Sequence, residues 1–233
     1  TFYAPESVLT ALGHIININT RSIEKTALSR FINTDKYSIV TDVGGFIWTK
    51  ESKTLVRMDP RTLKELQHWQ LGSYVTTLYA ADSILYTGTY DGKILSTGIY
   101  GKELTPQLFF QLPATITYLQ ALHGNIWAGT EKGLYQISRV NTGWDTVVSI
   151  PRLHVRSLYV SGENQVWGTS YENGIFLLQG KKITCFPVDR QQILRNAHCI
   201  VDDHQGSFWI TTNKGLFQAS KNDLLAFAAG MQQ

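Results

Sequence analysis

The sequence has few cysteines and no long run of basic residues, which are features of disulfide-rich, zinc-binding and nucleic-acid-binding proteins. It contains two cysteines in 233 residues, so neither a disulfide framework nor a zinc site of paired cysteines is indicated. Lys and Arg total 21 against 18 Asp and Glu, and no basic run exceeds two residues. A mildly basic chain without clustered Lys and Arg lacks the positively charged surface that is typical of nucleic-acid-binding proteins, so we expect no nucleic-acid partner.

Long hydrophobic runs are also absent. No stretch approaches the roughly 18 apolar residues that a transmembrane helix needs, and no secretory signal is recognisable. Thr1 is not an initiating residue, so we expect a mature product or an excised fragment. Contact with a membrane is then expected only through segments outside this chain.

What the chain does have is aromatic and strand-forming character. Aromatic residues make up 12% and charged residues only 17%. This is the composition of a folded, strand-rich protein, and the length is sufficient for a sizeable core.

A phrase built on Trp, a small residue, Thr and Gly recurs about every 40 residues. Close copies occupy 124–135 and 206–217, and looser copies occupy 45–55, 82–95 and 163–176. The anchoring aromatics of the five copies are Trp48, Tyr86, Trp127, Trp167 and Trp209. All-strand repeats of this period are typical of β-propeller blades.

Each repeat predicts four short strands, because apolar and polar residues alternate between turns of Gly, Asn and Asp. We therefore expect an all-β fold, a single β-propeller domain over 1–233 with about six four-stranded blades, or part of a seven-bladed ring. The expected blades span approximately 5–34, 35–71, 72–112, 113–151, 152–194 and 195–219, followed by a helical tail at 221–230.

The two ends are irregular. In the degenerate first blade, 13–17 is expected as the second strand and 22–25 as the third. The last blade lacks a fourth strand, and Thr1 to Ala4 is hypothesised to supply it and so to remove an exposed edge. A helix is expected over 222–229, with a polar N-cap and a stop at Gly230.

The repeated phrase itself is interpreted as structural. Each anchor is expected on a second strand, filling the space between adjacent sheets, where a buried Trp removes about 150–250 Å² from water. Gly88 and Gly129 are strand glycines that permit close backbone approach. Cys185 is expected on an outer strand and Cys199 on the first strand of the next blade, as two buried, unpaired thiols.

The segment from Ile200 to Phe217, Ile-Val-Asp-Asp-His-Gln-Gly-Ser-Phe-Trp-Ile-Thr-Thr-Asn-Lys-Gly-Leu-Phe, resembles the two-component regulator propeller repeat. That family's blade has an apolar strand, an acidic turn ending in Gly, an aliphatic-Trp pair, a small residue, Thr and Gly-Leu. The match is close here and at 116–135, and looser at 39–55, 78–95 and 158–176. Tyr86 replaces Trp, Trp48 lacks the following small-Thr step, and the first blade has no match.

The resemblance implies the periplasmic sensor region of a bacterial hybrid two-component or diguanylate cyclase receptor. Its partners would be the neighbouring domains of the same receptor, and its natural ring would include further blades. A homodimer is left open. The resemblance implies no catalysis by this chain, although the whole receptor would carry a kinase or cyclase output domain.

Propellers usually bind ligands at one end of the axis, through the turns between second and third strands and the loops that lead into first strands. Aromatic and charged residues at these positions suit a carbohydrate or another small polar solute. The candidates are Tyr90, Asp91, Glu131, Lys132, His154, Arg156, Tyr171, Glu172, His198, Asn213 and Lys214, with Tyr74 and Asn196 also at first-strand starts. The alternative for any one of them is an ordinary polar turn.

Metal and catalytic motifs are weak, and we expect no metal, cofactor or catalytic residue. The densest cluster is His198 with Asp202, Asp203 and His204, but strand alternation separates its members. Paired carboxylates recur at turn positions of the repeat, which favours a structural role. No phosphate-binding glycine loop or nucleophile motif is present.

Three functions remain open. The leading hypothesis is a non-catalytic sensor propeller for a small polar ligand, in particular an oligosaccharide. The second is a polysaccharide lyase or glycosidase, which needs two carboxylates or a His/Tyr/Arg set converging at the axis. The third is a protein-binding scaffold, which an exposed apolar patch would favour.

Overall fold

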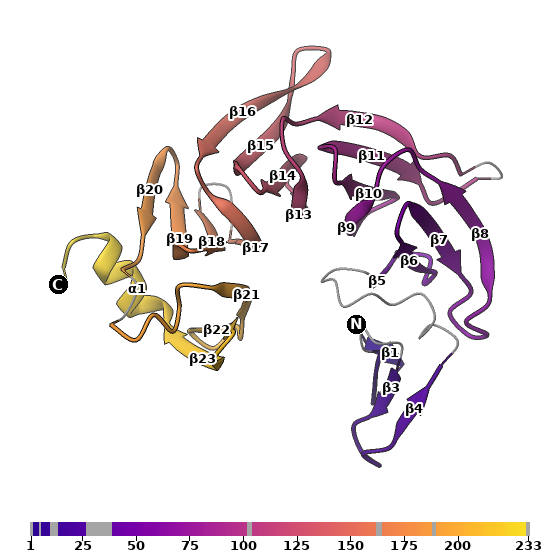
Figure 1. Ribbon diagram of the computed structural model, residues 1–233, viewed down its shortest axis with the longest axis horizontal. Coiled ribbons are helices and arrows are strands. Elements are labelled where there is room, and N and C mark those ends of the chain that lie inside the picture. The colour runs from indigo at the N-terminus through magenta and orange to yellow at the C-terminus, as the bar shows by residue number, and fades with distance from the viewer. Residues whose placement is uncertain are drawn as a thin grey trace. The chain divides into compact units, whose positions relative to one another are not determined.

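A computed structural model describes residues 2–4, 6–9, 14–26, 39–101, 104–161, 165–187 and 190–231. The chain forms two compact units, Thr1–Ile116 and Thr117–Gln233. Among the described residues, β-strands form six antiparallel sheets, and the single helix lies near the C-terminus (Figure 1). No helix in these ranges has the length and apolar character to cross a membrane.

The first unit contains three four-stranded sheets whose strands follow chain order. The first sheet comprises β1 (Phe2–Ala4), β2 (Ser7–Leu9), β3 (His14–Asn17) and β4 (Ile23–Lys25). The second comprises β5 (Ile39–Thr41), β6 (Ile47–Glu51), β7 (Thr54–Met58) and β8 (Glu65–Gln70). The third comprises β9 (Val75–Ala81), β10 (Ile84–Thr89), β11 (Lys93–Gly98) and β12 (Gln107–Gln111).

The second unit has two four-stranded sheets and one three-stranded sheet. The fourth sheet comprises β13 (Ile116–Leu122), β14 (Asn125–Thr130), β15 (Gly133–Val140) and β16 (Gly143–Pro151). The fifth comprises β17 (His154–Val160), β18 (Gln165–Tyr171), β19 (Gly174–Gln179) and β20 (Lys182–Cys185). The sixth comprises β21 (Ala197–Asp202), β22 (Ser207–Thr212) and β23 (Gly215–Ser220), and α1 (Lys221–Ala228) follows it.

The Thr of the repeated phrase shapes the turn between second and third strands. The buried Thr130 hydroxyl accepts hydrogen bonds from the backbone N–H groups of Lys132 at 3.1 Å and Gly133 at 2.9 Å. It also donates to the Gly133 carbonyl at 2.9 Å. Thr89 makes the equivalent bonds to Lys93. This part of the repeat therefore satisfies backbone groups that the strand ladder leaves unpaired.

Four of the five anchoring aromatics are buried, as expected: Trp48, Tyr86, Trp127 and Trp167. Trp127 packs in a cluster with Val155, Leu158 and Phe176 of the following sheet. Trp167 packs likewise against the sixth sheet, with its ring centroid 4.9 Å from that of Phe208. Gly129 permits this approach, because a Cβ there would lie 2.5 Å from Val155 Cγ1.

Trp209 departs from the expected packing, because 39% of its surface is exposed. Trp127 and Trp167 are each covered by the next sheet of the second unit, and the described part of that unit has no sheet after the sixth. Val201, 55% exposed, lies directly opposite Trp209 on the neighbouring strand. In the described part of the second unit, the anchor is therefore buried where another sheet follows and exposed where none does.

The ends of the chain correct two expectations. Residues 14–17 form the third strand of the first sheet rather than the second, and Ile23–Lys25 forms the fourth rather than the third. The reason is that Phe2–Ala4 pairs with β2 and adds a strand at the start of this sheet. Phe2–Ala4 therefore does not complete the sixth sheet, in which the structure describes three strands.

The helix is confirmed and the cysteine prediction is partly wrong. α1 has Ser220 as its N-cap, whose side chain accepts from the Asp223 N–H, and Gly230 follows with φ of 77°. Cys185 lies on the fourth strand of its sheet and the half-buried Cys199 on the first strand of the next, and neither forms a disulfide. Cys185 is exposed rather than buried, because β20 is the edge strand of its sheet.

Candidate ligand-binding site

Within the second unit, turns between second and third strands contact the residues that lead into the next sheet. The Arg152 N–H, before the fifth sheet, donates to the Lys132 carbonyl at 2.9 Å. The Gly174 N–H donates to the Arg195 carbonyl at 3.2 Å, and Tyr171 forms a β-bridge with Asn196. The repeat thus brings turn residues of one sheet beside the start of the next.

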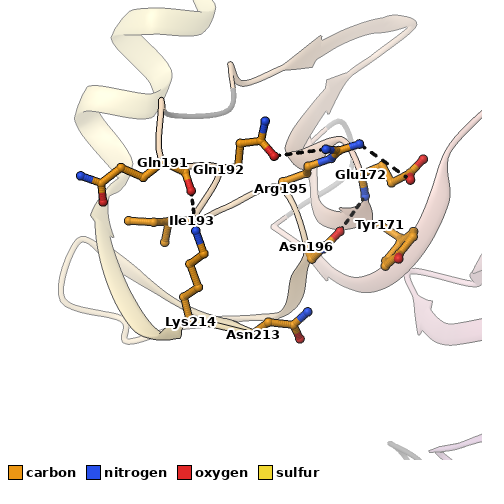
Figure 2. Close-up of a pocket in the computed structure, with 9 residues that line it drawn as sticks. All are labelled: Tyr171, Glu172, Gln191, Gln192, Ile193, Arg195, Asn196, Asn213 and Lys214. Carbon is orange, nitrogen blue, oxygen red and sulfur yellow. Dashed lines mark hydrogen bonds and ion pairs between the residues drawn. The ribbon is translucent and has the colours of Figure 1, made fainter.

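The last of these junctions contains an open cavity of about 410 Å³, within the range of about 300–1,000 Å³ that is usual for small-molecule sites. Its walls are the β18–β19 turn, the loop before β21 and the β22–β23 turn (Figure 2). The residues that line it are Tyr171, Glu172, Gln191, Gln192, Ile193, Arg195, Asn196, Asn213 and Lys214.

Hydrogen bonds connect the three walls. Asn196 Oδ1 accepts from the Glu172 N–H at 3.3 Å, and Lys214 Nζ donates to the Gln191 carbonyl at 2.5 Å. Arg195 donates to Gln192 Oε1 at 3.1 Å, while its other terminal nitrogen lies 3.9 Å from Glu172 Oε1. Figure 2 shows Arg195 reaching from the loop towards Glu172, and Lys214 reaching from its turn towards the loop. The pocket is therefore polar and held by its own contacts.

An aromatic and cationic group lies beside the pocket. The ring of Tyr171 is 5.6 Å from that of His154, and the Arg156 guanidinium lies 5.4 Å from the Tyr171 ring centroid. The pKa of His154 is lowered, mainly by partial burial and to a smaller extent by the positive charge of Arg156. The negative charges of Glu131 and Glu172 act in the opposite direction. His154 is therefore neutral near pH 7, when its ring can accept as well as donate a hydrogen bond.

The structure gathers eight of the eleven candidate residues around this junction. Tyr171, Glu172, Asn213 and Lys214 line the cavity, and His154 and Arg156 contact Tyr171. His198 Nε2 lies 2.5 Å from Asn213 Oδ1, and Glu131 acts electrostatically on His154. Lys132 lies at the preceding junction, where its carbonyl accepts a hydrogen bond from the Arg152 N–H.

Tyr90 and Asp91 lie in the first unit. Tyr90 is 61% exposed, whereas Asp91 accepts from the Thr89 hydroxyl at 2.7 Å and from Lys93 Nζ at 2.6 Å. Slight burial opposes ionisation of Asp91, but hydrogen bonds from Lys93, Thr89 and Ser73 outweigh it and lower its pKa to about 2. Asp91 therefore stabilises its own turn.

Four lining residues were not among the predicted candidates: Gln191, Gln192, Ile193 and Arg195. All belong to the connection between Cys185 and Ala197, while the strands β12 and β13 are separated by only Leu112 to Thr115. The length of that connection was the available sequence indication, since long loops in repeat folds often carry function.

The acidic cluster of the sixth sheet is structural, as its turn position suggested. Asp203 accepts from the N–H groups of Gln205 at 2.7 Å and Ser207 at 2.9 Å. Asp202 pairs with Lys221 of α1. No group of three His, Cys, Asp or Glu side chains in the described ranges is arranged to hold a metal ion.

No family model and no curated protein matches the sequence. Among solved structures, the extracellular domain of the putative hybrid two-component system BT4673 from B. thetaiotaomicron is similar with a TM-score of 0.68 at 16% identity. The match covers 91% of this chain and 30% of that chain. A streptogramin B lyase has a TM-score of 0.65 at 13% identity, covering 91% of this chain and 77% of that one.

A third similar structure is BamB from Moraxella catarrhalis, with a TM-score of 0.60 at 13% identity, covering 91% of this chain and 65% of that one. Identities this low show a shared fold and no shared function. The chain is therefore an all-β protein of antiparallel sheets whose fold is similar to those of solved propeller-like structures.

Proposed function

We propose that this chain is a non-catalytic sensor propeller that binds a small polar solute, such as an oligosaccharide, at the cavity between Tyr171 and Lys214. The observation that carries the proposal is the junction itself, where three turns and loops of consecutive sheets enclose about 410 Å³ with mostly polar side chains. A few polar groups in a preformed pocket are what recognition of a small polar molecule requires.

The wider assignment rests on the repeat and on the fold. We infer membership of the two-component regulator propeller repeat family, with about six blades forming part of a larger periplasmic receptor region. The resemblance of the repeated phrase supports this, as does the likeness to an extracellular domain of a hybrid two-component system. Signal output would then come from neighbouring domains of the same receptor.

A thermal-shift screen against oligosaccharides, amino acids and small anions tests the proposal. A ligand present at 100 times its dissociation constant stabilises the fold by about 2.7 kcal/mol. We expect a reproducible shift that Tyr171→Ala abolishes and that Tyr100→Ala, at an exposed tyrosine of the first unit, leaves unchanged. The ligand should be recovered unaltered. A shift that survives Tyr171→Ala would place binding elsewhere.

One observation favours an enzyme as the second candidate. His154 and Arg156 each lie beside the Tyr171 ring, at 5.6 Å and 5.4 Å, and together the three residues form a His/Tyr/Arg set of the kind that a polysaccharide lyase needs. In such a reaction a neutral base removes the proton beside a uronate carboxylate, the glycosidic C–O bond breaks, and a phenol protonates the leaving oxygen. An unsaturated product, lost in His154→Ala, would identify this activity and exclude the purely sensory role.

A further inference from the structure

The cavity described above carries more positive than negative charge. Two cations, Arg195 and Lys214, line it, against one carboxylate, Glu172. Arg156 adds a third cation beside Tyr171, and its Nε is buried without a hydrogen-bond partner in the described part of the chain. A pocket built only for a neutral solute has no need of this excess.

The internal partners of these cations are weak. The Arg195 and Glu172 side chains are 45% and 61% exposed and their charged atoms are 3.9 Å apart, so solvent screens most of their attraction. Lys214 Nζ donates to a neutral group, the backbone carbonyl of Gln191. Both cations thus retain charge that a ligand can neutralise. The Arg195 guanidinium donates one hydrogen bond to Gln192 and has further N–H donors for a carboxylate.

The remaining lining groups suit hydroxyls. Gln192, Asn196 and Asn213 line the pocket with side-chain amides. Their oxygens are already engaged, by Arg195, the Glu172 N–H and His198 Nε2, so their NH2 groups remain as donors to ligand hydroxyls. Tyr171 is 38% exposed and supplies an apolar surface for a sugar ring. The cations of the pocket therefore suit an acidic group of the ligand, and the amides suit its hydroxyl groups.

We propose that the ligand is an acidic saccharide whose carboxylate is held by Arg195 and Lys214 and whose hydroxyls are held by the amides of the loop before β21. This inference rests on the proposed function, because it names the ligand class of the same pocket.

Isothermal titration of the intact chain with digalacturonate and with neutral digalactose tests the proposal. We expect digalacturonate to bind at least about tenfold more tightly, a preference worth about 1.4 kcal/mol. Arg195→Gln and Lys214→Gln should each remove most of the preference. Arg139→Gln, at an exposed position of β15, is the matched control and should retain it.

The outcomes separate the two levels of the proposal. Equal affinity for both disaccharides would overturn the proposal of an acidic ligand, but it would agree with the proposal of a sensor for a small polar solute. If neither saccharide binds and amino acids and small anions also produce no thermal shift, both proposals fail. If sodium acetate displaces digalacturonate at equal concentration, the site binds a carboxylate without reading the sugar, which also overturns the proposal.

Discussion

At the scale of single residues, the Thr of the repeated phrase has a role that depends on its hydrogen bonds rather than on its size. Thr130 and Thr169 lie on the second strands of consecutive sheets, three residues after Trp127 and two residues after Trp167, and both are fully buried. Thr130 makes three hydrogen bonds to its turn, whereas the Thr169 hydroxyl has no partner in the described part of the chain. A buried Thr on a second strand therefore stabilises the following turn at the position three residues after the anchor, and not at the position two residues after it.

Thr130→Val should lower the free energy of unfolding by about 1–3 kcal/mol, because it leaves buried backbone groups of Gly133 unpaired. Thr169→Val should be neutral or stabilising, since it removes a hydroxyl that gains nothing from burial. Urea denaturation of the two variants measures both changes. Equal losses would show that the turn bonds contribute no net stability.

Asp202 connects the sixth sheet to α1. Its side chain is 5% exposed and pairs with Lys221, whose ammonium also lies 5.0 Å from the Phe208 ring centroid. Burial opposes its ionisation, but hydrogen bonds from Lys221, Tyr159 and His204 outweigh burial and lower its pKa to about 2. The ionised form is therefore the one that stabilises the fold.

Asp202→Asn should lower the free energy of unfolding at pH 7 by about 2 kcal/mol. The lowered pKa means that this contribution is fully present above the unfolded value of about 3.9 and is lost as pH falls towards about 2. Urea denaturation between pH 7 and pH 2 should show wild type and variant converging at the acid end. A constant gap would contradict the assignment.

At the scale of elements, sheets pack through second-strand positions of the repeat. Trp127 lies on one side of the contact between the fourth and fifth sheets, and Gly129, two residues later, lets Val155 approach the strand backbone. The two positions are complementary. The Trp127 side chain fills space between the sheets, whereas the absence of a side chain at Gly129 lets the neighbouring strand come close.

Gly129→Ala should destabilise the chain by about 1–3 kcal/mol, because the new methyl group overlaps Val155 and the fifth sheet must shift. Gly143→Ala is the control, since no atom lies within 4 Å of a Cβ there, and its effect should stay within about 0.5 kcal/mol. Thermal denaturation of both variants makes the comparison. A tolerated Gly129→Ala would mean that the sheets can separate without cost.

Strand positions could largely be predicted from the sequence, because alternation and Gly-containing turns act locally. In the close copy at 124–135, the expected pattern of strand, turn and strand is present as Asn125–Thr130 and Gly133–Val140. The first sheet was misassigned because it lacks the repeated phrase, and nothing local shows that Phe2–Ala4 pairs with β2. The exposure of Trp209 likewise depends on what covers its sheet, which its own sequence does not encode.

At the scale of the whole molecule, one type of contact recurs along the chain: a turn of one sheet contacts the residues that lead into the next sheet. Contacts such as Val75 N–H to the Ser52 carbonyl in the first unit and Gly174 N–H to the Arg195 carbonyl in the second illustrate it. Sequence placed most of the candidate residues at such junctions. It missed Arg195 and its neighbours because their loop has no counterpart in the repeat.

The most direct measurement is hydrogen–deuterium exchange of the chain with and without the oligosaccharide that gives the largest thermal shift. We expect slower exchange at 171–174, 190–196 and 213–215, the segments that enclose the cavity, and recovery of the saccharide intact. Exchange in the hairpin at 140–146 should not change. Protection elsewhere, or a saccharide converted to product, would contradict a non-catalytic binding site at this junction.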